Sequence, residues 1–299
     1  MKDATTMMSR ISDGTGFLAA LDQSGGSTPS ALRQYGIPDT AYSSDAEMFQ
    51  RMHEMRVRVM TAPPFSGDQI IGAILFEGTM NGVVEGKPVP AYLWDDRHIV
   101  PFVKVDKGLD AEADGVRLMK PIPTLDAVLA QAVRLGVFGT KMRSVINLPS
   151  RAGILAIVEQ QFDVAKRIMK HGLVPIVEPE VLISSPDKGQ AEAILLDTLL
   201  KELDKLEGDQ RVMLKLTIPE RPDHYAPVIC HDRIVRVVAL SGGYALDVAC
   251  ERLAVNHGMI ASFSRALLDG LKVSMNDAEF DAALAAPVEK IYRASTVKR

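Results

Sequence analysis

The sequence has few of the residues that build disulfide frameworks and metal sites. Only two cysteines occur, Cys230 and Cys250, and the six histidines form no short ligand-spaced pair in an expected strand. Zinc sites need clustered Cys, His or carboxylate ligands, so no metal site is predicted. The two thiols are expected to remain reduced, as in most chains without a secretory signal.

A net positive charge and a long apolar run are also missing. The formal net charge is −4, which argues against nucleic acid or an anionic membrane as the main partner. No apolar stretch reaches the length of a membrane span, and residues 1–4 lack the basic start and apolar core of a signal peptide. These absences favour a cytoplasmic protein with neither a nucleic-acid nor a membrane partner.

The chain does have enough apolar residues for a large core, 47% of 299, and they gather in eight runs. Most runs are separated by amphipathic helical spacing, and Ser44 with Glu47 predicts a capping box at the start of one such helix. This alternation predicts a closed parallel (β/α)8 barrel. Without any linker-like stretch, one domain over residues 1–299 is expected, with a polar N-terminal segment and a C-terminal helical tail. The runs are residues 17–22, 70–76, 101–105, 138–142, 173–178, 212–216, 234–240 and 259–262.

Lys215 interrupts the sixth of these runs. A buried ammonium group is costly unless it is paired or deprotonated. One interpretation places Lys215 at a strand end, where it reaches water. The other makes it a neutral nucleophile that condenses with a carbonyl group to form a Schiff base. Lys104 and Lys141 lie in two other runs, and such a cationic interior would keep one lysine neutral and attract anions.

Charged residues recur where the apolar runs end. In a parallel barrel these ends meet on one face, which is where the active sites of such barrels lie. Glu178 is the candidate that moves protons, and Glu180 is expected to orient Glu178 or to pair with a lysine. Lys141 is expected to keep Lys215 neutral. The residues at the ends are Asp22, Lys104, Lys141, Arg143, Glu178, Glu180, Lys215, Ser241, Ser262 and Arg265.

Two Ser-Gly-Gly loops indicate phosphate binding. Ser241, Gly242 and Gly243 follow the seventh run and precede a predicted helix, so they offer free backbone N–H groups. Barrels of this type often bind phosphate in the loops after strands seven and eight, and Arg265 supplies a fork-shaped counter-charge. A second loop, from Ser24 to Ser27, follows the first run. The pair of loops predicts a ligand phosphorylated at both ends.

Together these motifs resemble class I fructose-1,6-bisphosphate aldolase, in its shorter bacterial branch, over about residues 14–270. The resemblance implies that Lys215 is the Schiff-base lysine, that Glu178 is the main acid and base, and that Asp22 handles the C4 hydroxyl. It also implies that Lys141 stabilises charge near the carbinolamine and that Glu180 hydrogen-bonds within the lysine cluster. The motifs are residues 21–27 (LDQSGGS), 104–108 (KVDKG), 141–143 (KMR), 174–180 (VPIVEPE), 214–215 (LK), 240–243 (LSGG) and 262–267 (SFSRAL).

The resemblance also divides the anion-binding residues between the two ends of the substrate. Arg143 would border the substrate. Ser241, Gly242, Gly243 and Arg265 would hold the C1 phosphate, and Ser24, Ser27 and Lys104 would lie around the C6 phosphate. The chain stops at Arg299, without the long tail whose terminal tyrosine assists proton exchange in the animal enzymes. Tyr292 is the nearest replacement, and proton transfer at C3 stays unassigned.

The implied activity is reversible cleavage of fructose 1,6-bisphosphate to dihydroxyacetone phosphate and glyceraldehyde 3-phosphate, without a metal or other cofactor. The expected partners are therefore sugar bisphosphates and triose phosphates, and a homo-oligomer is possible. Two alternatives stay open. One is another Schiff-base barrel, such as a transaldolase or a deoxyribose-phosphate aldolase, which acts on singly phosphorylated substrates. The other is a barrel that has lost catalysis and serves as a scaffold.

Overall fold

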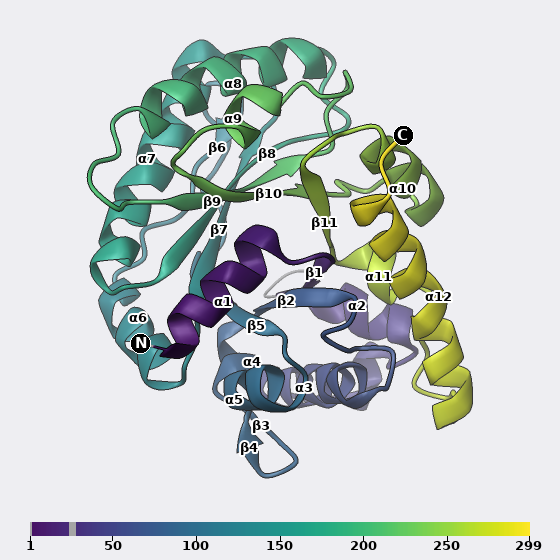
Figure 1. The fold of residues 1–299 in the computed structure, drawn as a ribbon. Helices are drawn as coiled ribbons and strands as arrows, with labels where there is room; N and C mark the ends of the chain where they lie inside the picture. Colours follow the sequence, from purple (N-terminus) through teal and green to yellow (C-terminus); the bar gives the residue numbers. More distant parts are fainter. Residues whose placement is uncertain (1, 24–27) are drawn as a thin grey trace.

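Eight parallel strands close into a barrel in the computed structural model, which describes residues 2–23 and 28–299. Strand β1 pairs with both β2 and β11, and β5 pairs with β7, so the sheet has no free edge among these eight strands (Figure 1). This confirms the predicted (β/α)8 barrel. The strands are β1 Phe17–Leu21, β2 Ile70–Leu75, β5 Val100–Lys104, β7 Gly139–Ile146, β8 Val174–Val181, β9 Val212–Thr217, β10 Ile234–Leu240 and β11 Met259–Phe263.

Both faces of the barrel strands are covered, which explains why the strands are continuous apolar runs in the sequence. Every residue of β2 and of β9 is buried. One set of side chains packs against the outer helices, including Leu214 and Leu216 of β9. The alternate set, including Met213, packs inside the barrel. Because strand side chains alternate, Lys215 shares the inward face with Met213.

The helices surround the barrel and follow the predicted pattern (Figure 1). Helix α3 begins after Ser44, whose Oγ accepts a hydrogen bond from the Glu47 backbone N–H at 3.2 Å. The Glu47 carboxylate accepts from the Ser43 backbone N–H and not from that of Ser44, so only half of the predicted capping box forms. The helices are α1 Lys2–Asp13, α2 Thr28–Tyr35, α3 Asp45–Thr61, α4 Glu77–Met80, α5 Val89–Ala91, α6 Leu125–Arg134, α7 Arg151–Lys170, α8 Lys188–Leu203, α9 Ala226–Ile229, α10 Leu246–Ala254, α11 Arg265–Leu268 and α12 Asp277–Thr296, with a 3-10 turn, η2, at Asp39–Ala41.

The polar N-terminal segment is helix α1, which closes the amino-terminal end of the barrel. Its few apolar side chains, including Met7 and Ile11, are buried against interior residues near the starts of the strands, such as Leu18, Ile71 and Val100. Figure 1 shows this helix lying across the strands. The interior residues that pack against α1 are therefore apolar, and the charged residue at that end, Arg236 of β10, donates to the Ser12 and Gly14 carbonyls.

The segment from residue 78 to residue 98 connects β2 to β5 through several short elements. A hairpin does form, but its strands, β3 Val83–Val84 and β4 Lys87–Pro88, are only two residues long. The chain then forms α5 and a π-helix, η3 Tyr92–Asp96, which contains the acidic pair Asp95 and Asp96. A further short strand, β6 Val116–Arg117, pairs antiparallel with β7 and was not predicted. Two-residue strands carry no periodicity that a sequence pattern could reveal.

Candidate active site

Lysines from three strands meet at the carboxyl end of the barrel. The register places Lys104 of β5 beside Lys141 of β7, and Lys215 lies on β9. The charged side chains line a cavity of about 620 Å³. Its lining includes Asp22, Gln23, Lys104, Asp106, Arg117, Lys141, Arg143, Glu178, Glu180, Lys215, Ser241, Gly242, Ser262, Ser264 and Arg265.

Lys215 is buried at the base of this cavity. The residue is 4% exposed, so the interpretation that it reaches bulk water at a strand end is wrong. Its Nζ lies 3.4 Å from Oε1 of Glu178 on the neighbouring strand β8. The lysine therefore faces a substrate-sized space and has a proton acceptor within reach, which is the geometry that nucleophilic catalysis by an amine needs.

Lys141 is held between two carboxylates. Its Nζ lies 2.5 Å from Asp22 Oδ2 and 2.9 Å from Glu178 Oε2. Burial acts to lower the pKa of Lys141, but Asp22 and Glu178 outweigh it and the net pKa is raised. Lys141 is therefore a fixed cation whose charge is balanced by two anions. The interior is thus an alternating network of charges, and not the purely cationic one that the three lysines predicted.

The two carboxylates are ionised because of the same lysines. Burial would raise the pKa of Asp22, yet Lys141 and then Lys215 lower it below its usual value of 3.8. Glu178 behaves in the same way: burial raises its pKa, and Lys141 and Lys215 bring the net value below 4.5. Both groups can therefore accept protons at neutral pH.

Glu180 does not join the lysine cluster. Its carboxylate forms an ion pair with the Arg143 Nε, so the expectation that Glu180 pairs with a lysine is wrong. The two residues lie on neighbouring strands, and Arg143 pairs in register with Glu178, two residues before Glu180. Because the Arg143 side chain is 37% exposed, it reaches the rim of the cavity, where it can meet an anionic ligand.

Gln161 on helix α7 supports the site, and the sequence did not predict this role. It is fully buried, and its side chain donates to the Glu178 carbonyl at 3.2 Å and accepts from the Glu178 N–H at 2.8 Å. These two bonds fix the backbone that carries the central carboxylate. In the sequence, Gln161 stands on a helix face otherwise formed by apolar residues such as Ile157 and Phe162. Because a buried amide needs hydrogen-bond partners, this pattern could have indicated a supporting role.

The predicted C1-phosphate residues lie across the cavity from Lys104. Ser241, Gly242 and Arg265 line the cavity, whereas Gly243 is not part of its lining. Gly242 has φ +62°, and a Cβ there would lie 2.7 Å from the Ile183 side chain, so glycine is required. Helix α10 begins only at Leu246, and the loop therefore does not lead into a helix as directly as predicted.

The predicted C6-phosphate residues are described only in part. Ser24 and Ser27 lie outside the described residues. Lys104 lines the cavity, but its Nζ donates to the Asp106 carboxylate at 2.6 Å and to the Asp106 carbonyl at 2.9 Å. The sequence did not predict this partner. Lys104 can still direct its remaining N–H toward a ligand, because an ammonium group has three donors.

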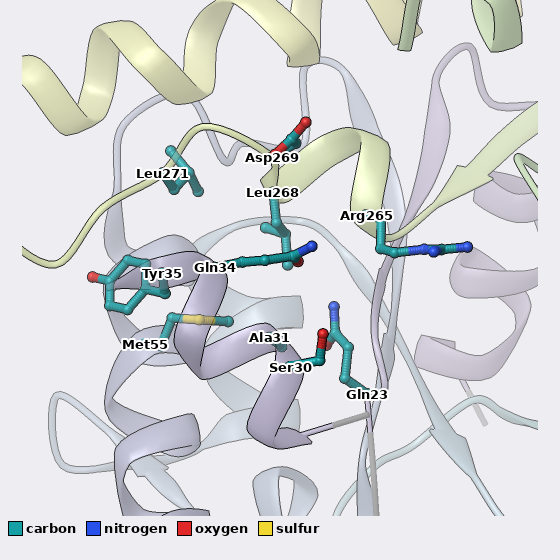
Figure 2. A pocket seen from close by; sticks show the side chains of 10 residues that line it. All are labelled: Gln23, Ser30, Ala31, Gln34, Tyr35, Met55, Arg265, Leu268, Asp269 and Leu271. Atoms are coloured by element: carbon teal, nitrogen blue, oxygen red, sulfur yellow. The ribbon is translucent and has the colours of Figure 1, made fainter. Parts of the chain in front are cut away.

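A side cavity of about 200 Å³ adjoins the main one (Figure 2). It lies between helices α2 and α3 on one side and α11 on the other, and it is lined by residues such as Tyr35, Met55 and Leu268. Gln23 and Arg265 line both cavities. These two residues therefore form part of the wall between the candidate active site and the side cavity.

Two kinds of feature are absent from residues 2–23 and 28–299. Those residues contain no group of three or more His, Cys, Asp and Glu side chains that could hold a metal ion. None of their helices is long and apolar enough to cross a membrane.

The buried carboxylates predict a loss of stability in acid. A carboxylate whose pKa is lower in the folded state stabilises the fold above its unfolded pKa and loses this effect as the pH falls toward its folded pKa. For Asp22 and Glu178 the loss begins below about pH 4.5, the usual pKa of a glutamate side chain. Asp22→Asn is expected to reduce the difference between the free energies of unfolding at pH 6 and at pH 3, measured by urea titration. Asp209→Asn, which changes an exposed acid, should leave that difference as it is in the wild type; equal behaviour of the two variants would contradict the prediction.

The fold and the cavity together define a class of barrel enzyme. Charged side chains at the carboxyl ends of parallel strands are typical of catalytic barrels, and a buried lysine beside a carboxylate is the arrangement that imine-forming lyases need. Comparison with known proteins gives the family. The chain belongs to the class I fructose-bisphosphate aldolases, whose family model matches residues 3–221.

Relatives agree with this family assignment, and a solved structure agrees with the barrel fold. The chain is 57% identical over 280 residues to fructose-bisphosphate aldolase class 1 of Synechocystis sp., covering 94% of this chain and 93% of the relative. It is 56% identical over 280 residues to the protein of the same name from Porphyromonas gingivalis, covering 94% and 95%. Among solved structures, it is similar to Plasmodium falciparum fructose-bisphosphate aldolase in complex with TRAP and a small-molecule inhibitor. That likeness has a TM-score of 0.76 at 21% identity and covers 100% of this chain and 96% of the other, and it supports the barrel fold.

Proposed function

We propose that the protein catalyses the reversible cleavage of fructose 1,6-bisphosphate to dihydroxyacetone phosphate and glyceraldehyde 3-phosphate through an imine on Lys215, without a metal. The observation that carries the proposal is the buried Lys215 amine, 3.4 Å from the Glu178 carboxylate at the base of the cavity. Family membership supports the substrate and the imine mechanism.

The open-chain substrate lies with its C2 carbonyl at Lys215. Ser241, Gly242 and Arg265 bind the C1 phosphate, with Gly243 next in the same loop. At the other end, Lys104 with Ser24 and Ser27 binds the C6 phosphate, while Arg143 borders the chain at the rim. The phosphates anchor the two ends, so the reacting carbon stays beside the amine.

Imine formation is the first chemical stage. Glu178 takes a proton from Lys215, whose neutral Nζ then attacks C2. The nitrogen passes one proton to the C2 oxygen, and Glu178 returns the proton it holds to the resulting hydroxyl, which leaves the carbinolamine as water. Lys141, fixed between Asp22 and Glu178, stabilises the negative charge that develops on the C2 oxygen. The product of this stage is an iminium ion, which is the electron sink for the next one.

Carbon–carbon cleavage follows. Asp22, whose pKa is lowered by its lysine neighbours in spite of burial, takes the proton of the C4 hydroxyl. The C3–C4 electron pair moves into the iminium group, and glyceraldehyde 3-phosphate leaves as an aldehyde. Protonation of the enamine at C3 and hydrolysis then release dihydroxyacetone phosphate and restore Lys215. No residue is assigned to the C3 step, because Tyr292 packs against the helix–barrel core and is not in the cavity lining described.

The setting of this reaction follows from the sequence. We propose a cytoplasmic protein that has one domain, acts on sugar phosphates without a nucleic-acid or membrane partner, and can form a homo-oligomer. The formal net charge of −4 supports the absence of a nucleic-acid partner.

Borohydride trapping tests the proposal directly. Reduction in the presence of dihydroxyacetone phosphate, followed by peptide mass mapping, should place the adduct on Lys215. An adduct on Lys141, or no adduct at all, would overturn the assignment. Cleavage of fructose 1,6-bisphosphate should be faster than that of singly phosphorylated sugars, which separates this activity from those of transaldolases and deoxyribose-phosphate aldolases. Full activity in the presence of a chelator separates it from metal-dependent aldolases.

A further inference from the structure

A hydrogen bond joins the ends of the first and last barrel strands above the candidate active site. The Gln23 side chain donates from Nε2 to the Ser264 Oγ at 2.6 Å, although the two residues are 241 positions apart. Gln23 follows Asp22 after β1, and Ser264 comes directly before Arg265 after β11. Both Gln23 and Ser264 line the main cavity, together with Ser241 and Gly242.

A buried arginine fixes the orientation of the Gln23 amide. Arg56 of helix α3 is 1% exposed, and its guanidinium donates to the backbone carbonyl of Gln23 and, at 3.4 Å, to the Gln23 Oε1. It also donates to the Thr79 Oγ1 at 2.8 Å. Because a guanidinium can only donate, the Gln23 amide must turn its oxygen toward Arg56. Its NH₂ group then faces Ser264, and Figure 2 shows the Gln23 amide pointing toward the side of the cavity that carries Arg265.

This arrangement sets the role of the Ser264 hydroxyl. A hydroxyl has one proton to donate and can also accept, and Ser264 already accepts from Gln23. Its proton is therefore available for an acceptor on the cavity side. The adjacent cavity residues Ser241, Gly242 and Arg265 are those that the proposed function assigns to the C1 phosphate.

We propose that the Ser264 hydroxyl donates a hydrogen bond to the C1 phosphate of the substrate, and that Gln23 is a positioning residue that directs this hydroxyl. This inference rests on the proposed function for the identity of the ligand. Ser264 thereby adds a side-chain donor to the phosphate-binding residues after β11. Through Gln23, a residue that follows β1 also contributes to binding the C1 phosphate, at the opposite end of the substrate from Lys104.

The test compares a ligand with and without the phosphate. Borohydride trapping on Lys215 is measured against the concentration of dihydroxyacetone phosphate and, separately, of dihydroxyacetone. Ser264→Ala should raise the half-saturating concentration of the phosphate ester about tenfold, because hydrogen bonds to charged groups are among the stronger ones. The value for dihydroxyacetone should change less than about twofold, since it has no phosphate to bind. Ser264→Gly should behave as Ser264→Ala does.

Gln23→Ala tests the positioning role. It should raise the half-saturating concentration of dihydroxyacetone phosphate about threefold in the wild-type background and should add little in the Ser264→Ala background, because the two residues act through one hydrogen bond. Additive effects in the double variant would overturn the role of Gln23. Ser9→Ala, on the exposed face of α1 at the other end of the barrel, is the matched control. It should leave the half-saturating concentrations of both ligands unchanged.

Two outcomes overturn the role of Ser264: an unchanged half-saturating concentration for dihydroxyacetone phosphate, or equal losses for both ligands. Calorimetric titration with inorganic phosphate does not depend on imine formation, and it should show several-fold weaker binding to Ser264→Ala. If the wild type formed no adduct with either ligand, the proposed function would fail, and the phosphate titration would still decide the role of Ser264. Thermal unfolding of each variant shows whether a loss reflects misfolding.

Discussion

Lys215→Met is expected to reduce the rate of fructose 1,6-bisphosphate cleavage by about 10⁵-fold or more, as the removal of a nucleophile does in other covalent enzymes. Methionine has a similar length, and Met213 of β9 already packs on the same inward face of the barrel, so the barrel should still form. Without the amine, no imine can take up the C3–C4 electron pair. The rate can be measured by coupling triose phosphate production to an NADH-linked assay.

Lys107→Met is the matched control for this variant. Lys107 pairs with Glu77 at 2.5 Å, and its side chain is 37% exposed, so its loss should change the rate less than about twofold, as for other exposed ion pairs. A Lys215→Met protein that is folded by circular dichroism and retains more than about one thousandth of the wild-type rate would contradict nucleophilic catalysis by Lys215.

Lys141→Met is expected to lower the free energy of unfolding by about 3–5 kcal/mol at neutral pH, the usual cost of removing one partner from a buried ion pair. Asp22 and Glu178 both lie within 2.9 Å of the Lys141 Nζ and would lose their nearest cation. The carboxylates should respond by binding protons, so the loss should be smaller in acid, where protonation removes the uncompensated charge. Urea titrations at pH 7 and at pH 4 measure both effects.

The control for Lys141 is an ion pair on the surface. Lys201 pairs with Asp197 at 2.7 Å on helix α8, with side chains 68% and 55% exposed. Lys201→Met should cost less than about 1 kcal/mol, because solvent screens exposed pairs. If Lys141→Met and Lys201→Met unfolded at the same urea concentration, the buried network would not contribute to stability as its geometry indicates.

The barrel could be predicted because a strand covered on both faces leaves a continuous apolar run in the sequence. Charged residues at the ends of such runs, including Asp22, Glu178 and Lys215, then had to meet on one face once the ring closed. The partners within that face could not be predicted. Glu180 pairs with Arg143, and Lys104 pairs with Asp106, because the pairing depends on the stagger between strands and on rotamers that no sequence spacing specifies.

The supporting residues were the hardest to predict. Gln161 and Arg56 belong to helices α7 and α3, far in sequence from the strand residues they hold. Each is a polar side chain on a helix face that is otherwise apolar, and such a pattern predicts burial without naming the partner. The bond between Gln23 and Ser264 is similar, because it exists only when the two ends of the barrel meet.

The closing contact between β1 and β11 has a consequence during synthesis. A ribosome that has released the first 220 residues has already delivered Asp22, Lys141, Glu178 and Lys215, yet β1 still lacks its second neighbour. Residues 259–263 must emerge before the ring can close, and helix α12 then covers the seam, where the Ser295 hydroxyl accepts from the Ala261 N–H at 3.0 Å. The nascent chain is therefore expected to remain inactive until residues 259–263 have left the ribosome, and the appearance of activity would mark the closure of the ring.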